Sequence, residues 1–168
     1  MSEPPSPKPP TRVPSLGPRG EGWFVLQLLL MALIFGAGLL FGANWSGAPR
    51  FAAALAGVVM IVLGLGLGFL GVRDLDQSLS PMPRPTDNAV LISDGIYRRL
   101  RHPIYAGVML LGLGWALLTA SVVALALALL LAVVLDLKAR REEAWLTERF
   151  AGYPSYAART RRFVPGVY

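Results

Sequence analysis

The chain of 168 residues has the composition of a membrane protein, with 54% hydrophobic residues, 15% charged residues and a mean hydropathy of +0.53. Its formal net charge is +6, but the basic residues flank apolar runs instead of alternating with aromatic residues, which argues against a nucleic-acid partner. The sequence has no cysteine and one histidine. This excludes disulfides and thiolate ligands and argues against a metal centre.

Residues 1–22 predict a disordered tail, because they hold seven of the fourteen prolines and too little apolar surface to offset the entropy of ordering. Residues 23–168 are expected to form one membrane domain. Its first apolar run, 23–42, is long enough to cross about 30 Å of hydrocarbon, and nothing in it resembles the cleavage site of a signal peptide. Residues 51–72 predict a second span.

The polar connection 73–101 is longer than most loops, and we expect it to form a lid or one wall of a site. After it, only residues 120 and 121 separate the apolar segments 103–119 and 122–137, which predicts a tight helical hairpin. A charged helix over 138–150 is expected to continue the second of these segments, followed by a further helix over 153–163.

The distribution of basic residues predicts the orientation. Fifteen of the sixteen lysines and arginines lie in the tail, the long connection or the C-terminal region, and only Arg50 lies in the opposite turns. Because cytoplasmic loops are enriched in lysine and arginine, we predict an all-α, multi-pass membrane protein with four spans and both termini in the cytoplasm. In this arrangement the histidine and the pair Glu142–Glu143 share one face of the membrane.

The only histidine precedes a proline at the start of the third predicted span. Proline favours the first position of a helix, so Pro103 is expected to begin the helix and His102 to be its N-cap. Free N–H groups at this helix start, together with Arg98, Arg99 and Arg101, predict a site for an anionic group.

Several motifs occur in an order that resembles a known superfamily. They are Gly95-Ile96-Tyr97, Arg101-His102-Pro103-Ile104-Tyr105, Gly107 and, near the C-terminus, Glu142-Glu143. This order is similar to that of the isoprenylcysteine carboxyl methyltransferase and phospholipid methyltransferase superfamily of integral membrane enzymes. The resemblance covers about residues 75–168.

The resemblance implies a site for S-adenosylmethionine and a lipophilic acceptor that enters from the bilayer. The implied cofactor-binding residues are Val90, Leu91, Ile92, Tyr97, Arg101, His102, Pro103, Ile104, Tyr105, Glu142 and Glu143. The prenylcysteine enzymes place a substrate-contacting arginine four residues before the first glutamate, where this chain has Lys138. We therefore take Lys138, Arg140 and Arg141 as candidates on the substrate side.

Other interpretations remain open at this point. The charged residues around Glu142 would also suit an ion-pair ladder on a solvated helix. An NADPH-dependent membrane reductase similar to sterol reductases would use the same arginines for phosphate groups, and a four-span protein without enzymatic activity would use them as a membrane anchor. The sequence leaves the methyl acceptor and the oligomeric state open.

Overall fold

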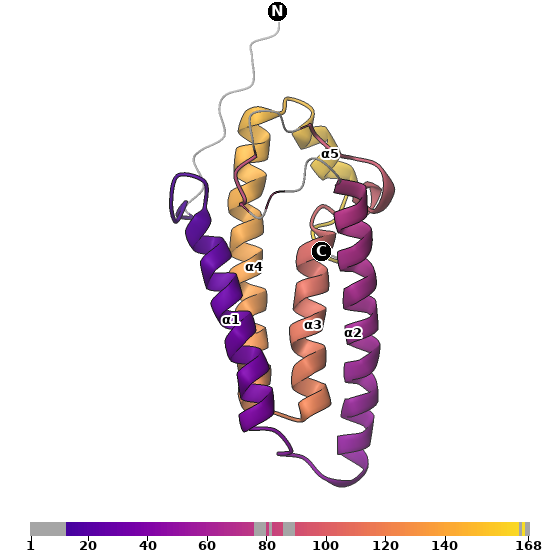
Figure 1. Ribbon diagram of the computed structural model, residues 1–168. Coiled ribbons are helices and arrows are strands. Elements are labelled where there is room, and N and C mark those ends of the chain that lie inside the picture. The colour runs from indigo at the N-terminus through magenta and orange to yellow at the C-terminus, as the bar shows by residue number, and fades with distance from the viewer. Residues whose placement is uncertain (1–12, 76–79, 81, 86–89, 165, 167–168) are drawn as a thin grey trace, which may run out of the picture.

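The computed structural model describes residues 13–75, 80, 82–85, 90–164 and 166. Its long helices are α1 (Glu21–Leu40), α2 (Gly47–Leu75), α3 (Pro103–Thr119) and α4 (Val122–Arg149). The short helices η2 (Gly95–Arg98) and α5 (Tyr153–Arg159) lie at one end of the bundle (Figure 1). The described residues contain no strand, only an isolated bridge between Leu100 and Arg161. The all-α prediction is therefore confirmed for this part of the chain.

Three helices, α1, α2 and α4, are long and apolar enough to cross a membrane. Helix α3 is also apolar but has 17 residues, which extend about 25 Å at 1.5 Å per residue. It packs between α2 and α4 (Figure 1). Large apolar side chains such as Leu33, Phe51 and Phe69 are exposed on the outer helix faces, as expected for surfaces that contact lipid.

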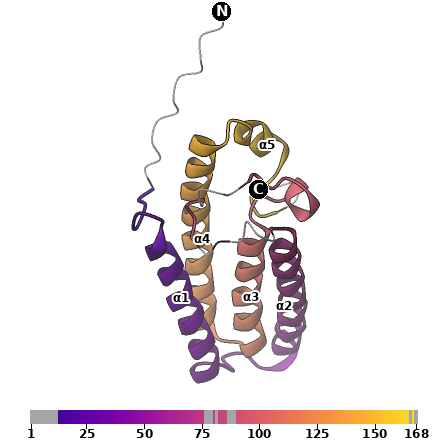
Figure 2. The same cartoon turned by 45° about the horizontal axis from the view of Figure 1, so that its top comes forward.

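The helices alternate in direction, so the start of α1, the end of α2, the start of α3 and the end of α4 lie together (Figures 1 and 2). The predicted charged helix 138–150 is the second half of α4, while α5 ends at Arg159, before the expected residue 163. The expected tight hairpin is confirmed at Ala120 and Ser121. The Ser121 hydroxyl accepts a hydrogen bond from the Ala124 N–H and donates one to the Ala37 carbonyl, both at 3.2 Å.

Glycines allow the backbones of α2 and α3 to approach closely. A Cβ atom at Gly64 would lie 2.8 Å from the Gly107 carbonyl oxygen, and one at Gly57 would lie 2.6 Å from that of Gly114. Real Cβ atoms do not approach backbone oxygens this closely. Gly57 and Gly64 therefore serve packing within the chain.

The segment just before α1 differs from the disorder predicted for residues 1–22. The buried indole of Trp23 donates a hydrogen bond to the Pro14 carbonyl at 3.1 Å, and Arg84 donates one to the Pro18 carbonyl at 3.0 Å. An indole N–H that leaves water needs such a partner, and this backbone supplies it. Residues 1–12 of the predicted tail lie outside the described residues.

We expect Gly64→Ala to destabilise the protein by roughly 1–3 kcal/mol, the range for overpacking a tight contact. The control is Gly66→Ala, two residues along α2, where an added Cβ meets nothing within 4 Å. Thermal unfolding in detergent would compare the two variants. Equal unfolding temperatures would show that the α2–α3 contact does not require glycine.

Candidate functional site

A pocket opens at the end of the bundle where α4 becomes charged, with about 680 Å³ of atom-free space including its open mouth. The connection between α2 and α3 forms one wall, as expected from its length. The lining residues are Leu75, Ser80, Met82, Pro83, Pro85, Val90, Leu91, Ile92, Tyr97 and Arg101, and on α4 and its continuation Glu142, Leu146, Phe150, Tyr153 and Tyr156.

Among these lining residues, Glu142 is the one acid and Arg101 the one base. The Tyr105 hydroxyl donates a hydrogen bond to Glu142 Oε2 at 2.6 Å, and His102 Nδ1 lies 3.9 Å from the same oxygen. The ring of His102 stacks on that of Tyr105, with 5.2 Å between the centroids. Contacts with Tyr105 and His102 at the start of α3 therefore orient the Glu142 side chain, which lines the pocket.

The adjacent acid, Glu143, has a different environment. Its carboxylate accepts hydrogen bonds from Arg101 Nε at 2.9 Å and from Arg162 Nη2 at 2.7 Å, and His102 Nε2 lies 3.2 Å away. Arg162 also donates to Asp136 at 3.0 Å. Glu143 therefore joins the start of α3, the charged half of α4 and the C-terminal segment.

The C-terminal segment runs beside the residues that lead into α3. The Arg101 N–H donates to the Arg161 carbonyl at 2.8 Å, and the His102 N–H donates to the Arg162 carbonyl at 3.1 Å. Helix α3 begins at Pro103 with His102 as its N-cap, as predicted, but the histidine side chain makes no capping hydrogen bond.

The helix start is covered by protein instead of facing the pocket, which differs from the anion site expected there. Pro103 is fully buried, and a Cβ at Gly71 of α2 would contact both Pro103 and Ile104. The exposed Arg98 and Arg99 border a separate hollow, together with Arg73 and Asp74.

Two tyrosines bind the pocket wall to the rest of the protein. The Tyr156 hydroxyl donates to the Tyr97 carbonyl at 2.8 Å, and the Tyr97 hydroxyl donates to the Gly71 carbonyl at 3.2 Å. Burial raises the pKa of Tyr156 to about 12 and raises that of Tyr97 as well. Both hydroxyls therefore remain protonated donors at neutral pH.

The structure brings Val90, Leu91, Ile92, Tyr97, Arg101 and Glu142 of the predicted cofactor-binding set together around the pocket. The other members of that set, His102, Pro103, Ile104, Tyr105 and Glu143, do not line it. Of these five, His102, Tyr105 and Glu143 make the side-chain contacts that orient Glu142 and Arg101.

None of the three substrate-side candidates lines the pocket. The buried Lys138 donates from Nζ to Gln27 Oε1 of α1 at 2.9 Å and lies 4.7 Å from the centre of the Tyr105 ring. Arg140 donates to Asp136, and the Arg141 guanidinium lies 4.3 Å from the centre of the Trp145 ring.

Gln27, Tyr153 and Arg162 were not among the site residues predicted from the sequence. For Gln27 a signal was present, because an amide inside an apolar span needs a polar partner. Arg162 and Tyr153 carried no distinguishing signal in the basic C-terminal region, since their partners are distant in sequence.

A comparison with known protein families matches residues 52–152 to the family described as phospholipid methyltransferase. The matched range includes most of α2 and all of α3 and α4. It leaves out α1, α5 and the C-terminal segment after α5, and therefore Gln27, Tyr153 and Arg162. No curated protein matches the chain at a significant level.

We expect Arg162→Gln to lower the free energy of unfolding by roughly 1.5–3 kcal/mol, the range for hydrogen bonds to charged groups. The loss follows because Glu143 keeps only Arg101 and His102 as partners. Arg159→Gln is the control, since Arg159 is exposed and donates to a carbonyl of its own helix. Thermal unfolding in detergent measures both. An Arg162 variant as stable as the Arg159 variant would contradict the role given to this arginine.

Proposed function

This chain belongs to the phospholipid methyltransferase family, and from that membership we propose that it is an integral membrane enzyme that transfers a methyl group from S-adenosylmethionine to a lipophilic acceptor. The proposal is supported by the exposed apolar faces of α1, α2 and α4, which suit a bilayer. It includes α3 as a fourth span and places both ends of the domain and the pocket in the cytoplasm, as the distribution of basic residues suggests.

The observation that carries the proposal is the composition of the pocket. Among the described lining residues, Glu142 is the one acid and Arg101 the one base, and the others are mostly apolar or aromatic. S-adenosylmethionine has complementary groups, namely ribose hydroxyls that donate to a carboxylate, an anionic carboxylate that suits a guanidinium, and an apolar ring system.

In this proposal Glu142 accepts hydrogen bonds from the ribose, and Arg101 lies at the end that holds the cofactor's carboxylate. Leu91, Ile92 and Phe150 surround the adenine. The bound cofactor supplies an activated methyl group, so the protein needs no nucleophile of its own. Its residues contribute alignment and exclusion of water.

Contacts outside the pocket keep Glu142 in place for this role. Tyr105 donates to it from α3, and Lys138, one turn before it on α4, lies against the face of the Tyr105 ring. The acceptor would reach the site from the bilayer and present an amine, a carboxylate or a thiolate. Lys138, Arg140 and Arg141 are the cations proposed to lie on the substrate side, and Lys138 is the buried one.

We expect Glu142→Gln to weaken binding of S-adenosylhomocysteine, the demethylated cofactor, by roughly 1.5–3 kcal/mol, because a neutral amide is a weaker acceptor than a carboxylate. Glu148→Gln is the control, since Glu148 is exposed on the same helix and does not line this pocket. Calorimetry on detergent-solubilised protein measures both affinities.

A Glu142 variant that binds as tightly as the control would remove this glutamate from the site. Stabilisation of the unaltered protein by NADPH, with no response to S-adenosylmethionine or its product, would instead favour the reductase interpretation.

A further inference from the structure

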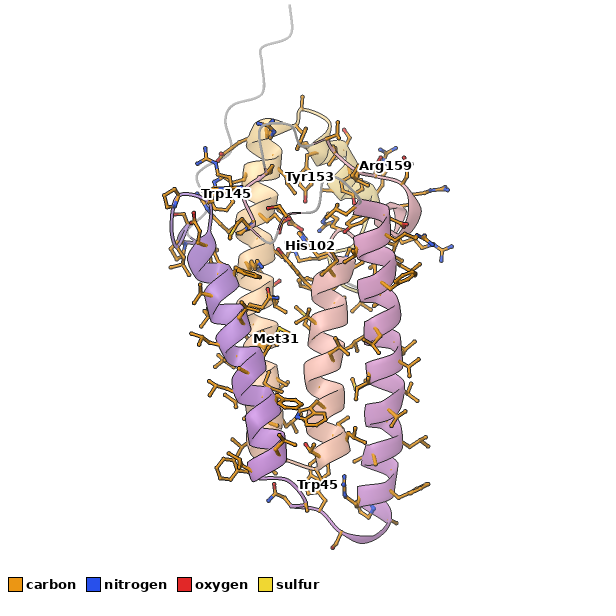
Figure 3. The ribbon with its side chains drawn as sticks, viewed as in Figure 1. Met31, Trp45, His102, Trp145, Tyr153 and Arg159 are labelled. Atoms are coloured by element: carbon orange, nitrogen blue, oxygen red, sulfur yellow. The ribbon has the colours of Figure 1, made fainter. Side chains whose placement is uncertain are left out.

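Tyr153, at the start of α5, lines the pocket, and no other described residue supplies a hydrogen-bond partner for its hydroxyl. The side chain is 3% exposed, and among the described residues no donor or acceptor reaches its buried oxygen. Figure 3 shows the residue at the same end of the bundle as His102. A buried polar group without a partner costs free energy, and such groups are uncommon in native proteins unless a function requires them.

The other tyrosine of α5, Tyr156, does have a hydrogen-bond partner for its hydroxyl. Tyr156 also lines the pocket, and its ring packs edge-on against that of Tyr153 with 5.8 Å between centroids. Its hydroxyl, however, donates to the Tyr97 carbonyl at 2.8 Å. One of the two hydroxyls therefore holds the fold together, while the other has no partner among the described residues.

The surroundings of Tyr153 indicate what kind of ligand group fits. Burial, followed by the negative charges of Glu143 and Glu142, raises the pKa of Tyr153 well above its ordinary value, and Arg101 opposes this shift, so the hydroxyl keeps its proton and can donate. Arg101 lies against the same short helix, because its Nη1 donates to the Ala157 carbonyl at 2.8 Å and to the Thr160 carbonyl at 2.6 Å. A neutral donor close to a guanidinium can bind a carboxylate oxygen of a ligand.

We propose that the Tyr153 hydroxyl is a ligand-binding group that donates a hydrogen bond to the carboxylate of the bound cofactor, on the side of the pocket formed by Arg101. This inference rests on the proposed function. It assigns a direct contact to a residue that lies just beyond the family match, on the helix that closes the pocket.

The test compares Tyr153→Phe with Tyr156→Phe in the full-length, detergent-solubilised protein. Two probes are titrated by calorimetry: S-adenosylhomocysteine, and 5′-methylthioadenosine, which has the same nucleoside but no amino-acid part. We expect Tyr153→Phe to weaken S-adenosylhomocysteine binding about tenfold or more, the effect of losing a hydrogen bond to a charged group. Its affinity for 5′-methylthioadenosine and its unfolding temperature without ligand should not fall.

The matched variant should behave in the opposite way. Tyr156→Phe removes the bond to the Tyr97 carbonyl, so it should lower the unfolding temperature without ligand. Unchanged S-adenosylhomocysteine affinity in Tyr153→Phe overturns the inference, and so does an equal loss for both probes, because the hydroxyl would then contact the nucleoside. If the unaltered protein binds neither probe, the proposed function itself fails.

Discussion

The carboxylate of Glu143 is the contact on which the site depends. A carboxylate removed from water must be matched by donors and cations, and here Arg101, His102 and Arg162 provide them. These partners come from the start of α3 and from the C-terminal segment, so one acid joins three parts of the chain. Adjacent residues on a helix point in different directions, which leaves Glu142 facing the pocket while Glu143 is enclosed.

Two regions outside the family match, α1 and the C-terminal segment, also contact the charged half of α4. The Lys138 ammonium is buried and needs an acceptor, which Gln27 provides from α1. Arg162 comes from the opposite end of the sequence and pairs with Glu143. Helix α1 and the C-terminal segment are therefore part of the structure that positions the charged half of α4, in addition to covering it.

Close packing of α2 and α3 determines where the pocket wall lies. Glycines bring the two backbones into contact, so α2 ends beside the start of α3, and the Gly71 carbonyl can accept the Tyr97 hydroxyl. The connection between these helices is much longer than the gap it crosses. Its described residues fold over toward α4, where Pro83, Leu91 and Ile92 line the pocket.

The resemblance to a known superfamily singled out the acid pair. The sequence by itself determined the long helices, the start of α3 at Pro103, and the hairpin at Ala120 and Ser121. These follow from local rules, because apolar length and proline geometry act within a few residues. Only the tertiary structure decided which acid faces the pocket, that the start of α3 is covered, and that no described residue partners the Tyr153 hydroxyl. The reason is that each depends on contacts between residues far apart in the chain, such as His102 with Arg162 and Lys138 with Gln27, which no local pattern specifies.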